Sequence, residues 1–176
     1  MKRFGYIFGI FFAFAASASA QPATSRWNGY LFFAPGASEI GSTAGRATIH
    51  IGGGGEAFIY HGLSLGAEVG PIISWSPPGS GFRSDVHGLG SANIAYHFLP
   101  KTTERKLEPF LTAGYSLFFS GLSVPGRGLT GTQSGYNVGG GVNLWFQRKY
   151  AIRLEVRHQS SIWYKTMDIR LGMTFK

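Results

Sequence analysis

Alternating apolar and polar residues are the feature that most constrains the fold of this chain. In the segment 166–175, Met167, Ile169, Leu171, Met173 and Phe175 alternate with polar or small residues. Successive side chains of a β-strand point to opposite faces, so this pattern predicts a strand with one apolar face. After residue 20, no segment shows the apolar spacing of an amphipathic helix. The sequence therefore predicts an all-β protein.

The same alternation recurs in seven further segments, which makes eight predicted strands, an even number. The other seven lie at 27–34, 47–60, 63–75, 86–99, 111–119, 136–146 and 152–157. Most are long enough for a tilted transmembrane strand, which needs about 9–11 residues. The connections 61–62, 100–106 and 147–150 are short, whereas 35–46, 76–85 and 121–134 are longer and rich in Gly, Pro and Ser. Short turns at one end and long loops at the other indicate an antiparallel up-and-down barrel of the outer-membrane kind.

The first twenty residues have the pattern of a secretory signal peptide. Lys2 and Arg3 precede an apolar run over 4–16, and Ala18-Ser19-Ala20 fits a cleavage site. We therefore expect residues 1–20 to be removed and residues 21–176 to form one barrel domain in a bacterial outer membrane. The net charge of +8 alone would allow a nucleic-acid binder, but the signal peptide argues against that class.

Composition narrows the chemistry further. The chain has no cysteine, which excludes disulfide scaffolds, Cys-ligated zinc and thiol nucleophiles. Its five histidines do not have the spacing of a metal site. We accordingly predict no metal and no cofactor.

The polar face of the predicted strands carries both charges and glycines. A soluble barrel would turn this face to water, whereas a membrane barrel would turn it inward. Glycine has no obvious use on a water-facing surface, but inside a narrow eight-stranded barrel it leaves room for larger neighbours. We therefore expect the polar face to point into a membrane barrel. The glycines on this face are Gly52, Gly54, Gly66, Gly70, Gly114, Gly139, Gly141 and Gly172. Buried charges must pair, and the predicted lumen network consists of Glu56, Glu68, Arg153, Glu155, Arg157, Asp168 and Arg170.

The opposite face is aliphatic, with aromatic residues towards the strand ends. Such residues form two interfacial girdles in outer-membrane barrels. The candidates are Trp27, Trp75, Tyr96, Phe98, Tyr136, Phe146 and Phe175.

From about Tyr136 onward the chain resembles the last three strands of the OmpA/OmpX-like family of small bacterial outer-membrane β-barrels. The segment concerned ends GVNLWFQRKYAIRLEVRHQSSIWYKTMDIRLGMTFK. The resemblance implies an eight-stranded barrel and the barrel-assembly machinery as a partner. It also implies that Phe175 is the terminal aromatic that this machinery recognises, although Lys176 follows it here.

A second, weaker resemblance is to the lipid A 3-O-deacylases, which carry an H-x-S motif in a comparable place. His158 and Ser160 match that motif. Ser161 stands where the family has asparagine, and Arg170 where it has an acid, so that Asp168 is the nearest carboxylate. This resemblance implies a lipid acyl-ester hydrolase in which His158 activates Ser160.

Three functions therefore remain open at this point. The favoured one is a non-enzymatic structural or surface-interaction protein that acts through its outer loops. The alternatives are the hydrolase and, third, a minor pore. Lipid and lipopolysaccharide are expected partners, because arginine pairs well with phosphate and basic residues lie on or near the outer loops. These are Arg46, Arg83, Arg127 and Lys165. The sequence predicts no nucleic-acid partner.

Overall fold

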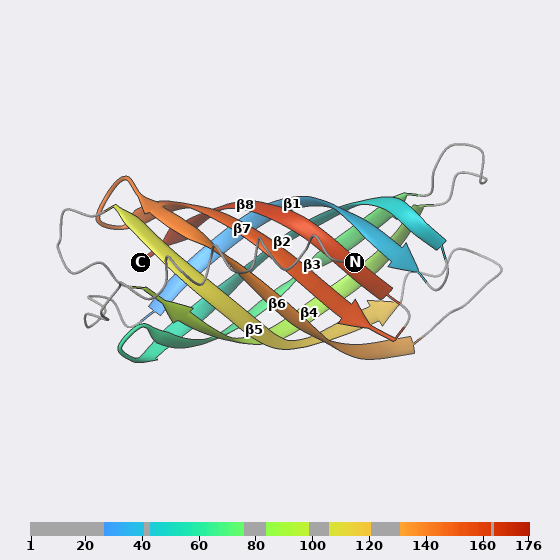
Figure 1. The fold of residues 1–176 in the computed structure, drawn as a ribbon, viewed down its shortest axis with the longest axis horizontal. Coiled ribbons are helices and arrows are strands. Elements are labelled where there is room, and N and C mark those ends of the chain that lie inside the picture. The colour runs from blue at the N-terminus through green and yellow to red at the C-terminus, as the bar shows by residue number, and fades with distance from the viewer. Residues whose placement is uncertain (1–26, 41–42, 76–83, 99–105, 121–130, 163) are drawn as a thin grey trace, which may run out of the picture.

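The protein is a closed barrel of eight antiparallel strands in the computed structural model (Figure 1). The structure describes residues 27–40, 43–75, 84–98, 106–120, 131–162 and 164–176. The strands are β1 (Trp27–Ile40), β2 (Thr43–Tyr60), β3 (Leu63–Trp75), β4 (Ser84–His97), β5 (Leu107–Ser120), β6 (Gly131–Trp145), β7 (Tyr150–Ser161) and β8 (Tyr164–Phe175). The predicted fold class is thereby confirmed. The predicted signal peptide lies outside the described residues.

Each strand pairs with its neighbour in sequence, and β1 pairs with β8 to close the barrel. Across that seam Gly29 lies opposite Phe175, and Ile40 lies opposite Tyr164. The chain therefore enters β1 and leaves β8 at the same end of the barrel, the end on the left in Figure 1. The His61-Gly62 turn lies at this end too, with both residues in the left-handed region (φ 37° and 87°). None of the described residues forms a helix that could cross a membrane.

Several strands are longer than predicted, among them β5, β6 and β7, and the largest single difference is at the end of β1. Residues 35–46 were expected to form a long outer loop, and this was wrong. β1 continues to Ile40 and β2 begins at Thr43, with Pro35 opposite Ile49 and Ser38 opposite Arg46. Proline lacks a backbone N–H, and the β1–β8 ladder has no pair at Ala34 or Pro35, whereas the β1–β2 ladder continues through Pro35. Ser84 and Asp85 likewise belong to β4, and residues 131–134 to β6.

The barrel is polar inside and apolar outside. Buried residues on the inner face include asparagine, serine, threonine, glutamate and arginine. Large aliphatic side chains face outward, for example Leu171, which is 56% exposed, and Val69, which is 69% exposed. This distribution is the reverse of that in a soluble barrel, where the interior is apolar.

Glycines on the inner face leave room for the large side chains next to them. A Cβ added at Gly54 would lie 2.8 Å from the Tyr30 ring, and one added at Gly52 would lie 2.7 Å from the Phe32 ring. A Cβ at Gly139 would lie 3.1 Å from a carboxylate oxygen of Glu155. Backbone carbonyls of the adjacent strands approach the same positions. These glycines therefore allow both close strand approach and bulky side chains inside.

Candidate functional site: the charged lumen

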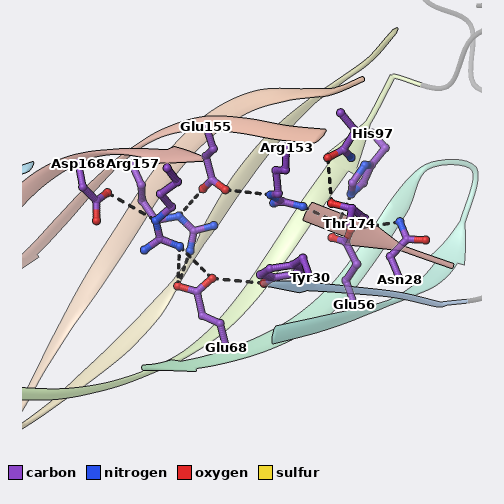
Figure 2. A network of polar contacts seen from close by, with 12 residues as sticks. Asn28, Tyr30, Glu56, Glu68, His97, Arg153, Glu155, Arg157, Asp168 and Thr174 are labelled. Atoms are coloured by element: carbon purple, nitrogen blue, oxygen red, sulfur yellow. Dashed lines mark hydrogen bonds and ion pairs between the residues drawn. The ribbon is translucent and has the colours of Figure 1, made fainter. Parts of the chain in front are cut away.

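The centre of the lumen is organised around the carboxylate of Glu68 on β3 (Figure 2). Its Oε1 accepts hydrogen bonds from Arg157 Nη1 at 2.8 Å and Arg170 Nη1 at 2.9 Å. Its Oε2 accepts one from the Tyr30 hydroxyl at 3.3 Å. The side chains of Glu68, Arg157 and Arg170 are each 1% exposed. One carboxylate thus joins β1, β3, β7 and β8 across the barrel.

Glu155 continues the network along β7. Its two oxygens accept from Arg157 Nε at 2.5 Å and from Arg153 Nε at 3.1 Å. The Arg153 guanidinium also lies over the Phe110 ring, 3.9 Å from its centroid, and over the Tyr30 ring at 4.5 Å. A cation placed on aromatic faces is stabilised by the ring quadrupole, more so where water is excluded.

At the end where the chain enters and leaves, a histidine lies between two carboxylates. His97 Nδ1 is 2.8 Å from Glu108 Oε1, and its Nε2 is 3.1 Å from Glu56 Oε2. Ionised carboxylates only accept hydrogen bonds, so both ring nitrogens must carry a proton to satisfy this geometry. His97 in this arrangement supplies one positive charge. Asn143 and Trp145 donate further hydrogen bonds to Glu108, at 3.1 and 2.9 Å.

Towards the opposite end, the network finishes at Asp168 and His50. Asp168 is 3.5 Å from Arg170 Nε and 3.7 Å from His50 Nδ1. Beyond these groups lies an apolar cluster of Ile72, Leu89, Phe118 and Tyr164, all buried. The Tyr164 hydroxyl is hydrogen-bonded to Ser74 at 3.0 Å. The inner charges are therefore covered at the end where β1 ends and β8 begins. We call this the long-loop end, because the connections 76–83 and 121–130 follow β3 and β5 there.

Positive and negative groups alternate along the whole lumen. Arg153 links the two halves, because its Nη1 lies 3.7 Å from Glu56 Oε1. The order is Glu108, His97, Glu56, Arg153, Glu155, Arg157, Glu68, Arg170 and Asp168. This series of ion pairs links strands on different sides of the barrel wall and fills the centre of the lumen.

All seven residues predicted for the lumen lie inside the barrel and are buried. The structure adds three that the sequence reasoning missed: His50, His97 and Glu108. For His97 and Glu108 a signal existed, because they share strand parity with the polar residues Asn93 and Thr112, which places both on the inward face. Their mutual contact depends on the register between β4 and β5, where His97 lies opposite Phe110.

The structure separates the carboxylate of the hydrolase hypothesis from the histidine and the serine. His158 shares the outward face of β7 with Val156, and its ring centroid lies 6.2 Å from that of Tyr136. Ser160, two residues further along the same face, is 8% exposed. Asp168 is 2% exposed and points into the lumen, where it contacts Arg170 and His50. The carboxylate is therefore on the other side of the barrel wall from His158.

Aromatic residues lie at the strand ends, as the interfacial girdles require. Trp27, at the start of β1, is 57% exposed, and Phe146, directly after β6, is 50% exposed. Tyr136 is also 57% exposed, but it lies within β6 rather than at its end. Phe175, the predicted assembly signal, is half-buried, and it faces the Cα of Gly29 so closely that a Cβ there would overlap its ring. Within the described part of the chain, no three His, Asp or Glu side chains are grouped so as to hold a metal ion.

A closed eight-stranded barrel with an apolar exterior and a paired, charged interior is a small transmembrane β-barrel of the outer-membrane type. No protein-family model and no curated protein sequence matches the chain. Solved structures do match.

Neisserial surface protein A (NspA) is similar with a TM-score of 0.72 at 15% identity, covering 88% of this chain and 99% of that one. The N-terminal β-barrel domain of Pseudomonas aeruginosa OprF gives 0.56 at 15% identity, covering 86% and 98%. Ail, the attachment invasion locus protein of Yersinia pestis, was solved with the heparin analogue sucrose octasulfate and gives 0.59 at 8% identity, covering 85% and 96%. At these identities the likeness establishes the fold.

Proposed function

We propose that this protein is a non-enzymatic barrel of the bacterial outer membrane that holds its outer loops at the cell surface, in a structural or surface-interaction role. The observation that carries the proposal is the pairing of an apolar outer wall with a lumen closed by ion pairs. An apolar exterior favours a lipid environment. A filled lumen leaves the loops as the part of the molecule that can meet a partner. Lipopolysaccharide phosphates and the barrel-assembly machinery are the partners proposed from the sequence.

Two measurements on cells and purified protein test this proposal. After fractionation of the membranes, the protein is expected in the outer-membrane fraction with residues 1–20 absent. Without boiling, it is expected to migrate differently on a denaturing gel than after boiling, because a closed barrel offers detergent no strand edge to open. Recovery in the soluble fraction, or identical migration in both conditions, would refute the membrane barrel.

Two further experiments test the pore hypothesis and the hydrolase hypothesis. Planar bilayers containing the purified barrel are expected to show no single-channel steps, because Glu68, Arg157 and Arg170 join across the lumen. Incubation with lipid A is expected to release no fatty acid detectable by mass spectrometry. Acyl release that disappears in Ser160→Ala would instead establish the hydrolase.

A further inference from the structure

The two ends of the barrel differ in the charge that they present. At the long-loop end, described residues of unlike charge lie next to each other. Arg46 pairs with Asp85 at 2.6 Å, and Glu39 is the register partner of Lys165 across the β1–β8 seam. At the end with the short turns, Lys106, Arg148 and Lys149 are all exposed. The side-chain carboxylates of Glu56 and Glu108 at this end are 6% and 3% exposed and face the lumen.

Backbone contacts bring these cations to one side of the rim. Trp145 N donates to Lys106 O at 2.7 Å, and Lys176 N donates to Lys149 O at 3.0 Å. The Lys176 ammonium lies 3.9 Å from the centroid of the Trp145 ring. We call Lys106, Arg148, Lys149 and Lys176 the basic rim. It spans the ends of β5, β6, β7 and β8.

Exposed aromatic rings lie directly beside the basic rim. Phe146 and Tyr150 are 50% and 43% exposed, with their rings stacked at a centroid distance of 6.4 Å. Aromatic residues of this kind sit at the level of the lipid headgroups, and long basic side chains reach from there towards phosphates. Positive charge and interfacial aromatics on the same rim are complementary to an anionic membrane surface.

We propose that the basic rim binds the phosphodiester headgroups of anionic phospholipids, in the leaflet on the short-turn side of the barrel. The proposal rests on the membrane location proposed above and adds a lipid preference to it. The binding is electrostatic, so it weakens as added salt screens the charges. The aromatic rings fix the depth of the barrel, and the cations select the headgroup. No single phosphate pocket is required.

The test uses the full mature barrel folded in zwitterionic detergent. Phosphatidylglycerol and phosphatidylcholine are added in equal amounts, and retained lipids are identified by native mass spectrometry. The wild-type barrel is expected to retain phosphatidylglycerol several-fold over phosphatidylcholine at low salt. The triple variant Lys106→Gln, Arg148→Gln, Lys149→Gln is expected to lose this preference. The single variant Lys149→Gln should lose part of it, and the matched variant Lys165→Gln at the other end should keep it.

Three results would overturn the proposal. These are an unchanged preference in the triple variant, an equal loss in Lys165→Gln and Lys149→Gln, or displacement of the lipid by millimolar inorganic phosphate at constant ionic strength. Unboiled gel migration of every variant shows whether the barrel is folded. A folded barrel without lipid preference contradicts this inference alone, whereas a protein without heat-dependent migration contradicts the membrane barrel itself.

Discussion

Replacing Glu68 by glutamine tests whether the lumen network stabilises the barrel. Glutamine keeps the shape of the side chain but removes the charge that Arg157 and Arg170 share. It also places an amide donor at one of the two oxygen positions, both of which now accept from Arg170. Breaking a buried ion pair by removing one partner costs about 3–5 kcal/mol, because the remaining charge stays buried and uncompensated.

This free energy corresponds to a large shift in a urea titration. For a dependence of about 2 kcal/mol per M, a loss of about 3–5 kcal/mol lowers the unfolding midpoint by about 1.5–2.5 M. The assay is tryptophan fluorescence of the barrel in lipid vesicles, read at equilibrium. The control is Glu39→Gln, because Glu39 is exposed at the end of β1 and an exposed pair contributes only about 0–1 kcal/mol.

Equal midpoints for the two variants would refute the reasoning. Glu68 would then behave as a solvated carboxylate, and a filled, water-excluding lumen would be wrong. The pore hypothesis would become the better description of the interior.

Three further substitutions probe other parts of the barrel. Leu171→Arg puts a charge on the outward face, which costs about 2–4 kcal/mol near the midplane of a bilayer, so the fraction assembled in vesicles should fall; normal assembly would show that this face meets water. Gly54→Ala places a Cβ on the Tyr30 ring and the neighbouring backbone, so its urea midpoint should fall well below that of Gly90→Ala, where an added Cβ meets only the Phe119 ring at an ordinary contact distance of 3.5 Å. His97→Leu leaves Glu56 and Glu108 without their shared positive charge and should lower the midpoint, whereas His61→Asn in the exposed turn should not; similar midpoints for these two would argue against an imidazolium at His97.

The sequence predicts the strands well where the alternation is strict. In β8, where the alternation is cleanest, the outward face is that of Met167 and Leu171, as predicted. In β3 the predicted and observed limits coincide at 63–75 although the alternation is less clean there, whereas β7 extends beyond its predicted limits to 150–161. The prediction fails at residues 35–46, where proline and glycine suggest a loop. The pairing that keeps β1 and β2 extended involves partners on two neighbouring strands, and local composition does not contain that information.

The inner site is predictable in its composition but not in its contacts. Strand parity places the charges of β7 and β8 inside, and it does so without any knowledge of partners. That Arg157 and Arg170 meet on Glu68, or that Arg153 stacks on Phe110, depends on how far the strands are staggered around the barrel. Stagger is fixed by closure of the whole sheet, so it cannot be derived from one segment at a time.

The partners of Glu68 have a consequence for the order in which the barrel can be completed. Its two arginines follow 89 and 102 residues later in the chain, on the final hairpin. Until β7 and β8 have docked, this carboxylate has neither counter-ion, and an unpaired charge is costly to move out of water. Inserting an incomplete sheet into the hydrocarbon of the membrane therefore costs additional free energy. Docking of β7 and β8 supplies both counter-ions and removes this cost. We therefore expect insertion into the lipid to be completed late, after all eight strands have paired.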